Sequence, residues 1–218
     1  MITAVIFDMF ETLVTHFESP LYMGKQIADD IGITEQKFRE IWNPTDIDRT
    51  LGKKTLEEVI TEILQVNNCY STELFDKIIT KRTRLKIECF KHIHPELIPL
   101  FKAIKELNIK IGLITNCYFE EEKVIKNSIF FPYFDAVCIS CELGIKKPNS
   151  AIFQKCMKDL SVKPEECLYI GDGGCFELET AQSLGMHPIQ ATWYFKNGVN
   201  PSSERKPKFL EATPPLDI

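Results

Sequence analysis

Short apolar segments alternate with helix-like segments over the second half of the chain, and this alternation constrains the fold more than any other feature of the sequence. The apolar segments have the length of strands and lie at residues 109–115, 136–140, 167–171 and 187–190. Strands that alternate with helices form a parallel sheet with helices on both faces. We therefore predict an α/β fold whose core is a doubly wound, Rossmann-like parallel sheet.

The first strand of this sheet is far from the others in the sequence. Residues 3–8 are β-branched and aromatic and end in an acid, whereas no strand pattern interrupts residues 16–88. A strand at the start of the chain and strands near its end must pair across this helical stretch. We expect a core domain of residues 1–15 and 89–218, with an all-helical cap subdomain of residues 16–88 inserted after the first strand.

The expected cap carries recognisable helix signals. Polar N-cap residues, a proline at a first helical position and a glycine stop occur there in the order typical of several short helices. These signals are Ser19-Pro20 for one helix start, Gly32 for a helix end, Thr55 with Glu58 for a capping box, and Ser71 for a further start. At the other end of the chain, the tail from residue 196 is rich in Pro, Ser and charge, and we expect it to be irregular apart from an edge strand near Phe209.

Composition narrows the classes of partner. The 218 residues carry a net charge of −5 and a pI near 5.5, which argues against nucleic acid or an acidic membrane as a partner because both need basic surfaces. No apolar run approaches the roughly 18 residues of a spanning helix, and the first residues lack the basic segment and cleavage site of a signal peptide. We expect a cytoplasmic protein with a small-molecule substrate. Its oligomeric state cannot be read from the sequence.

Eight cysteines are many for a chain of this length. They are scattered through expected strands and helices without the regular spacings of a disulfide framework. The one CxxC pair, Cys138 and Cys141, has no second pair to complete a zinc site. We expect free thiols that pack as small apolar side chains in a reducing compartment.

Polar and charged residues gather where the expected strands end. Asp8 ends the first strand, Thr115 and Asn116 end the second, Lys147 follows the third, and Asp172 follows the fourth. Each of them alone fits a turn or a solvated surface. The carboxyl ends of parallel strands meet at one rim, however, and ligands bind there in open α/β sheets. The sequence therefore predicts a site that combines two acids, a hydroxyl group and a lysine.

These segments resemble the motifs of the haloacid dehalogenase superfamily of hydrolases, in the branch with a helical cap after the first strand. The matching segments are FDMFETL at residues 7–13, LITN at 113–116, GIKKP at 144–148, and GD at 171–172 with the later Ala181 and Gly185-Met186. Each segment is modest, but their order and spacing together are specific, and the resemblance covers nearly the whole chain.

The resemblance implies a covalent mechanism with a metal ion. Asp8 would be the nucleophile and would become transiently esterified, a known strategy for carboxylates. Mg²⁺ would be held by Asp8, the backbone carbonyl of Phe10 and Asp172, because hard dications prefer oxygen ligands. Glu177 stands where the family often has a second acid, which supports the metal or holds the lysine. An exposed helix residue is the alternative interpretation of Glu177.

The resemblance also implies a set of groups that bind the oxygens of the transferring group. Thr115, the backbone N–H of Asn116 and Lys147 would take this role, and Met9 belongs to the same substrate-binding set. Together with the nucleophile, Thr115 and Lys147 would be catalytic, because positioned donors stabilise developing charge. Lys147 is preferred to Lys146 because it is the residue directly before the proline.

One departure from the family pattern bears on function. Most phosphatases of the superfamily have a general acid two residues after the nucleophile, where this chain has Phe10. A backbone carbonyl can still bind metal there, but proton transfer to the leaving oxygen is lost, and a general acid contributes about 10²–10⁴-fold. Glu11, at a position that is usually glycine, is a hypothetical replacement.

Three functions follow from this pattern. A Mg²⁺-dependent phosphatase of a small phosphorylated metabolite is preferred, because Gly171-Asp172 resembles the metal-binding form of the family. A metal-independent 2-haloacid dehalogenase is the alternative, since halide leaves without a proton. A phosphate-binding regulatory protein with weak catalysis is the third. His16, Tyr22 and Arg49 lie in the expected cap, and we interpret each as an ordinary surface or packing residue.

Overall fold

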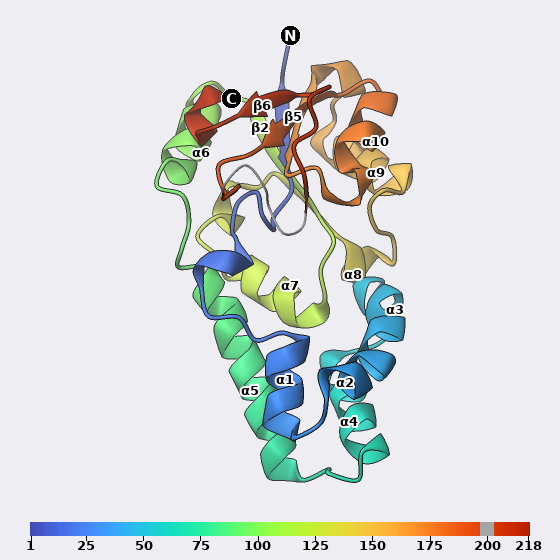
Figure 1. The fold of residues 1–218 in the computed structure, drawn as a ribbon. Helices are drawn as coiled ribbons and strands as arrows, with labels where there is room; N and C mark the ends of the chain where they lie inside the picture. Colours follow the sequence, from blue (N-terminus) through green and yellow to red (C-terminus); the bar gives the residue numbers. More distant parts are fainter. Residues whose placement is uncertain (197–202) are drawn as a thin grey trace.

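A computed structural model describes residues 1–196 and 203–218, and its centre is a parallel sheet of six strands in the described residues (Figure 1). The strand order is β3-β2-β1-β4-β5-β6, and every neighbouring pair is parallel. The strands are β1 (Ala4–Phe7), β2 (Lys110–Thr115), β3 (Ala136–Ile139), β4 (Cys167–Gly171), β5 (His187–Ala191) and β6 (Leu210–Ala212). The predicted doubly wound sheet is confirmed, including the edge strand after Phe209.

Alternate residues of β1 pack into two different hydrophobic cores. Val5 and Phe7 lie on the face covered by α6 (Leu97–Glu106) and α7 (Phe119–Lys126). Ala4 and Ile6 lie on the opposite face, which α9 (Ser150–Leu160) and α10 (Glu177–Ser183) cover. Each fully buried aliphatic or aromatic side chain stabilises such a core by about 1.5–3 kcal/mol. A strand buried on both sides therefore fixes the position of whatever follows it.

The strand order changes direction at β1. From β1 the sheet continues through β2 and β3 on one side and through β4, β5 and β6 on the other. In doubly wound sheets this point opens a crevice beyond the carboxyl ends of the two central strands. Asp8 and Asp172 directly follow these two strands, β1 and β4.

Between β1 and α6 the chain is helical, and these helices lie beyond one end of the sheet (Figure 1). They are α1 (Gly24–Ile31), α2 (Glu35–Trp42), α3 (Asp46–Thr50), α4 (Leu56–Val66) and α5 (Thr72–Cys89). The apolar faces of α1, α2, α4 and α5 share a hydrophobic core of their own, which includes Ile27, Phe38, Ile60 and Ile78. We call residues 16–89 the helical block. The exact division of the chain into two domains stays a prediction.

Most of the helix signals in the block are confirmed. Thr55 and Glu58 form the predicted capping box, Ser71 caps α5, and Gly32 ends α1 with a φ of 82°. The predicted start at Ser19-Pro20 is wrong, because α1 begins at Gly24. The Ser19 hydroxyl donates back to the carbonyl of His16 and closes a 3-10 turn instead of capping the next helix.

Two further expectations concern the whole chain. All eight cysteines are free thiols, and only Cys175 is exposed. In the described residues, none of the helices combines the length and the apolar character needed to cross a bilayer.

Candidate active site

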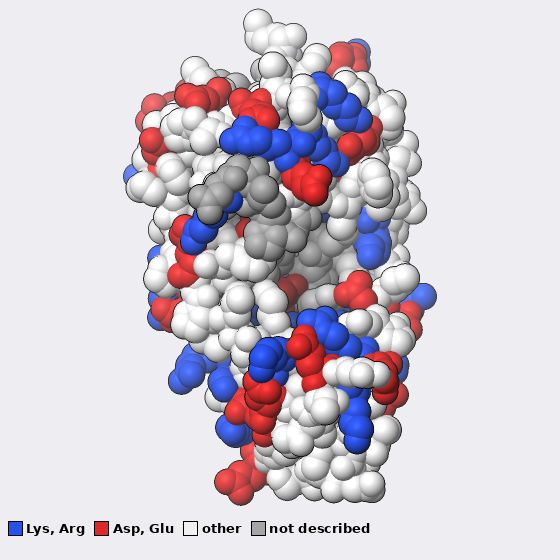
Figure 2. All heavy atoms as spheres, viewed as in Figure 1, with Lys and Arg blue, Asp and Glu red and all other residues white. Residues whose placement is uncertain are grey.

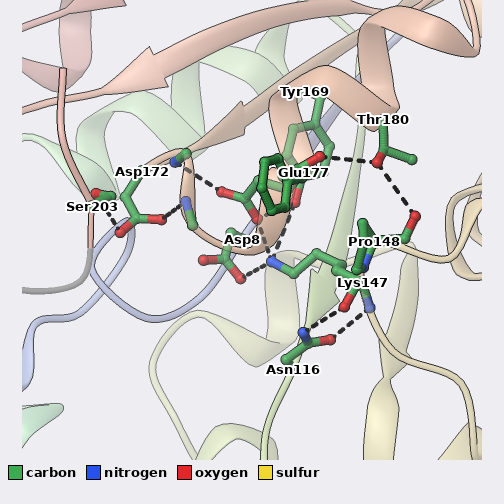
Figure 3. Close-up of polar contacts among 12 residues, drawn as sticks. Asp8, Asn116, Lys147, Pro148, Tyr169, Asp172, Glu177, Thr180 and Ser203 are labelled. Carbon is green, nitrogen blue, oxygen red and sulfur yellow. Dashed lines mark hydrogen bonds and ion pairs between the residues drawn. The ribbon is translucent and has the colours of Figure 1, made fainter. Parts of the chain in front are cut away.

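Three carboxylates meet at the crevice between β1 and β4 (Figure 3). Asp8 is held beside β4 because its backbone N–H donates to the carbonyl of Ile170 at 2.8 Å. Asp172 follows β4, and Glu177 is the first residue of α10. One oxygen atom from each of the three carboxylates lies within 4.8 Å of the other two, and all three residues are buried. The two acids predicted from the strand ends are therefore brought together, with Glu177 as a third.

Lys147 reaches into the middle of these carboxylates. Its Nζ donates to Oδ1 of Asp8 at 2.5 Å, to Oε2 of Glu177, and to the hydroxyl of Tyr169 at 3.3 Å. The backbone of Lys147 is fixed by the Asn116 side chain, which accepts from the Lys147 N–H at 2.8 Å and donates to its carbonyl at 3.1 Å. The end of β2 thereby positions a lysine from a distant loop. This use of the Asn116 side chain was not expected from the sequence.

Glu177 uses both of its carboxylate oxygens to hold this arrangement. Oε1 accepts from the N–H of Gly173 at 3.1 Å, and Oε2 accepts from the Tyr169 hydroxyl at 2.8 Å as well as from Lys147. Its interpretation as an exposed helix residue is wrong, since it is 1% exposed. A Cβ on Gly171 would lie 2.0 Å from Oε1, so glycine is required there for the carboxylate to approach the strand.

Asp172 is oriented by its neighbours on both sides. Its Oδ1 accepts from the N–H of Gly174 and its Oδ2 from the Ser203 hydroxyl, each at 2.9 Å. Gln190 on β5 donates to the Asp172 backbone carbonyl at 2.7 Å. Ser203 and Gln190 carried no signal in the sequence, because each is a single polar residue in a segment without a motif.

The site contains more buried negative charge than its lysine can balance. Burial, together with the charges of Glu177 and Asp172, raises the pKa of Asp8 to about 8 against the opposing effect of Lys147. Burial and Glu177 raise the pKa of Asp172 to about 6. Burial alone would lower the pKa of Lys147, but Asp8 and Glu177 outweigh it and raise that pKa. Three carboxylates with one ammonium leave an excess of negative charge, which a dication that prefers oxygen ligands would balance.

The other predicted site residues surround this cluster in different ways. Thr115 ends β2 and is fully buried, and its hydroxyl has no hydrogen-bond partner among the described residues. A buried hydroxyl without a partner is costly, which fits a position that a ligand oxygen completes. The Met9 side chain is buried in the core beneath α6, so only its backbone can face a ligand.

A cavity of about 520 Å³ extends from the carboxylates to the helical block. Figure 2 shows a recess between the two parts of the molecule, with basic and acidic side chains mixed over this face. Helices α1, α2, α3 and α5 contribute Gly24, Arg39, Trp42, Asp46, Thr50, Arg82 and Lys86 to the cavity lining.

The expectations for individual residues of the helical block have different outcomes. His16 lines the cavity, whereas Arg49 is 1% exposed and packs between the rings of Trp42 and Tyr118, 3.8 and 4.2 Å from their centroids. Arg82 and Lys86 were not singled out from the sequence. Ile78, Arg82 and Lys86 follow one another at intervals of four residues, so the two cations lie on the same face of α5 as the buried Ile78. This helical spacing is the sequence signal that indicates them.

Buried ion pairs join α5 to α7 beside the cavity. Arg82 Nε lies 3.1 Å from Glu120 Oε1, and Lys86 pairs with Glu121. Burial would raise the pKa of Glu121, but Lys86 and other cations nearby lower it to about 2. Burial and the charge of Lys86 lower the pKa of His16 to about 3, so its ring is neutral at physiological pH.

The segment that follows Asp8 places an aromatic ring next to the cluster. The Phe10 side chain lines the cavity and stacks on His16 with 4.7 Å between ring centroids. Glu11 adopts a φ of 60° and turns its carboxylate toward its own loop, where it accepts from the Thr15 hydroxyl at 2.6 Å and the His16 N–H at 3.0 Å.

Comparison with known proteins shows which family the chain is similar to. A family model described as haloacid dehalogenase-like hydrolase matches residues 2–185. A glyceraldehyde 3-phosphate phosphatase of Methanocaldococcus jannaschii is 34% identical over 87% of this chain and 85% of the relative. Its counterpart from Methanopyrus kandleri is 36% identical, but the match covers 44% of this chain and 42% of that protein. The pyrophosphatase PpaX of Bacillus mycoides is 26% identical over 57% of this chain and 63% of the relative.

Solved structures share the fold at low sequence identity. A HAD family enzyme from Bacteroides thetaiotaomicron, in complex with magnesium and inorganic phosphate, has a TM-score of 0.69 at 20% identity and covers 93% of this chain and 98% of its own. A structure described as a dehalogenase has a TM-score of 0.61 at 18% identity, covering 99% of this chain and 94% of its own.

Proposed function

The chain belongs to the haloacid dehalogenase-like hydrolase family, and we propose that it is a magnesium-dependent phosphatase of a small phosphorylated metabolite. The observation that supports this most directly is the buried group of Asp8, Asp172 and Glu177 around Lys147. A dehalogenase that attacks carbon has no need for a surplus of buried carboxylates. A phosphatase needs one to bind the cation that offsets phosphate charge.

The residues present fit a magnesium site. Asp8, Asp172 and the backbone carbonyl of Phe10 would hold the ion, since oxygen ligands suit Mg²⁺. Bound Mg²⁺ neutralises charge on the phosphoryl oxygens and so permits a carboxylate to approach them. Glu177 is committed to Lys147, Tyr169 and Gly173 through both oxygens, so we assign it to holding the lysine.

The proposed reaction has two steps at Asp8. A carboxylate oxygen of Asp8 forms a bond to phosphorus while the bond from phosphorus to the leaving oxygen breaks, which gives an aspartyl phosphate. Water then attacks phosphorus and releases inorganic phosphate and free Asp8. Lys147, the Thr115 hydroxyl and backbone N–H groups of Met9 and Asn116 donate to the phosphoryl oxygens, whose charge they stabilise.

The cavity bounds the size of the substrate. About 520 Å³ is enough for a small metabolite, and the walls come from both the sheet and the helical block. We therefore propose that residues 16–88 act as a cap that shields the reaction from water and contacts the leaving group. The relatives named above act on a phosphate ester or on pyrophosphate, so both classes of substrate belong in a test. Eight free thiols favour a reducing compartment, and we place the protein in the cytoplasm.

Release of inorganic phosphate from a panel of small phosphate esters and anhydrides tests the proposal. We expect turnover with Mg²⁺, none with a chelator, and a loss of at least about 10³-fold in Asp8→Asn, which removes the nucleophile. Asp29→Asn, at an exposed acid of α1, is the matched control and should retain full activity.

Two other results would contradict the proposal. Release of halide from a 2-haloacid without metal would identify a dehalogenase. Binding of beryllofluoride without turnover of any phosphate compound would identify a regulatory phosphate-binding protein.

A further inference from the structure

The side chains of the cavity wall that faces the leaving group limit which substrates can react, if the chain has the proposed phosphatase function. In phosphoryl transfer the attacking and leaving oxygens lie roughly in line with phosphorus between them. With Asp8 as the attacking group, the leaving oxygen points away from the carboxylates and into the cavity. Phe10, His16 and Lys86 line that cavity. The chemistry of these side chains decides which leaving groups can depart.

Neither Phe10 nor Glu11 offers a proton to the leaving oxygen. The Phe10 side chain reaches the cavity but has no ionisable group. The Glu11 carboxylate accepts hydrogen bonds from the Thr15 hydroxyl at 2.6 Å and from the His16 N–H at 3.0 Å, so both of its oxygens act as acceptors within their own loop. A carboxylate in this arrangement stabilises the loop and is not set up as a donor.

Lys86 brings a cation to the same wall, whereas His16 adds no charge. Nε2 of His16 lies 3.4 Å from the Lys86 ammonium, and an ammonium has only donors, so Nε2 is the acceptor and the ring is neutral. The Lys86 ammonium lies 5.7 Å from the centroid of the Phe10 ring. Arg82, one turn earlier on α5, lines the cavity as well.

The remaining acids of the cavity are committed to partners. Tyr118 donates its hydroxyl proton to Asp46 at 2.5 Å, and Glu121 pairs with Lys86. Within residues 1–196 and 203–218, the cavity therefore presents aromatic rings and ion-paired cations toward the leaving group, and no carboxyl, imidazole or phenol group there is arranged to protonate it. A leaving oxygen must depart with its electron pair and its negative charge.

We propose that the substrates are anhydrides of phosphate, either acyl phosphates or phosphoanhydrides, rather than alkyl phosphate esters. As the bond from Asp8 to phosphorus forms, the bond from phosphorus to the leaving oxygen breaks, and the electron pair stays on a carboxylate or phosphate anion. Such anions are stable without a proton, whereas an alkoxide is not. Lys86 and Arg82 line the cavity into which the anion departs, each paired with a glutamate of α7, and their N–H donors would stabilise the anion.

Steady-state kinetics with Mg²⁺ test this choice of substrate. We expect kcat/KM for acetyl phosphate to exceed that for ethyl phosphate by more than about 10²-fold, the range that a general acid normally contributes. Across a series of aryl phosphates, log kcat/KM should fall steeply as the pKa of the leaving phenol rises. These measurements use the wild-type protein and need no variant to fold.

A pair of matched variants sharpens the test. Phe10→Asp places an acid beside the leaving oxygen, so it should raise kcat/KM for ethyl phosphate and flatten the dependence on leaving-group pKa. Phe10→Asn has almost the same size and polarity but no acidic proton, so it should do neither.

Two outcomes would overturn the inference, and they are distinguishable. If wild type hydrolyses ethyl phosphate as fast as acetyl phosphate, and Glu11→Gln abolishes only the former, Glu11 is the acid and the anhydride specificity is wrong while the phosphatase function stands. If neither compound nor any aryl phosphate is turned over, the phosphatase function fails and takes the inference with it.

Discussion

At the scale of single residues, the candidate site is organised by Lys147. Its side chain is 3% exposed, and its ammonium lies between Asp8 and Glu177, which would otherwise place two negative charges close together in a buried site. Removing one partner of a buried ion pair leaves an uncompensated charge, and that is far more costly than losing a surface pair. Lys147 is therefore expected to serve both stability and catalysis.

We expect Lys147→Met to lower kcat by about 10²–10³-fold, because a donor to the transferring phosphoryl group is lost. The free energy of unfolding of the metal-free protein should fall by about 3 kcal/mol. Phosphate release and urea denaturation measure the two effects. Lys146→Met is the matched control, since this neighbour lines the cavity without reaching the carboxylates, and an equal loss in both variants would contradict the assignment.

The pKa values of Asp8 and Asp172, the two acids proposed to bind the metal, predict how pH affects metal binding. In the metal-free protein the pKa of Asp8 is raised from 3.8 to about 8, and that of Asp172 to about 6. The folded state thus keeps protons that the unfolded state loses above about pH 4. Their stabilising effect is complete below that pH and is lost as the pH rises through 6 and 8.

Mg²⁺ takes the place of these protons, so its binding should release protons and become tighter as the pH rises. We expect the Kd for Mg²⁺ to fall about tenfold or more between pH 6 and pH 8, measured by titration calorimetry in buffers of different ionisation heat. The change should be much smaller in Asp8→Asn. A Kd that stays constant over this range would show that the carboxylates are not the ligands.

Some residues of the site could be predicted from the sequence, and others could not. Asp8 and Asp172 were predictable because parallel strands bring their carboxyl ends together at one edge of the sheet. Lys147 lies eight residues after the end of β3, and its choice over Lys146 depended on the family resemblance. The partnership of Asn116 with the Lys147 backbone, and that of Tyr169 with Glu177, depends on side-chain directions in three dimensions. No spacing in the sequence encodes them.

At the scale of elements, the connection between β4 and α10 shapes the site. Gly173 has a φ of 97°, and Cys175 and Phe176 follow with φ values of 51° and 53°. Positive φ is costly for residues with a Cβ, and such conformations gather at functional sites. The tight turn brings Glu177 back beneath the end of its own strand, where it meets Lys147.

Gly171→Ala should disrupt this connection. The added Cβ would lie 2.0 Å from Glu177 Oε1 and 2.7 Å from its Cδ, so the carboxylate must move away from Lys147. We expect kcat to fall about tenfold or more, and the free energy of unfolding to fall by about 1–3 kcal/mol.

A matched glycine provides the control. At Gly24, in α1, an added Cβ would make ordinary contacts of 3.5 Å, so Gly24→Ala should keep or raise the free energy of unfolding. Combining Gly171→Ala with Glu177→Asp shortens the displaced side chain and should restore part of the stability. If Gly171→Ala has no effect, the close approach of Glu177 is not required.

Element types were easier to predict than element starts. The capping box at Thr55 and the glycine stop at Gly32 act through local backbone hydrogen bonds, and both are found where the sequence placed them. Ser19-Pro20 was predicted from the same kind of local signal, but the Ser19 hydroxyl donates to the carbonyl of His16 in the preceding turn. A serine before a proline can either cap the helix that follows or hydrogen-bond to the turn that precedes it, and tertiary packing decides between the two.

At the scale of the whole molecule, the sheet and the helical block line one cavity between them. The sheet supplies the charged cluster at its switch point, and the block supplies the opposite wall with Trp42, Arg82 and Lys86. Sequence pattern predicted the two parts because hydrophobic periodicity differs between them. It did not predict the shared cavity, because the α5 cations that line it belong to a surface formed only when α5 packs on α7.

We propose that Asp8 and Asp172 together hold the ion that lets Asp8 attack phosphorus. A crystal structure of the protein grown with Mg²⁺ and beryllofluoride tests it most directly. We expect beryllium bonded to an Asp8 oxygen and one Mg²⁺ shared by Asp8, Asp172 and the Phe10 carbonyl. Beryllofluoride bound elsewhere, or a cluster that stays free of metal at millimolar Mg²⁺, would contradict the claim.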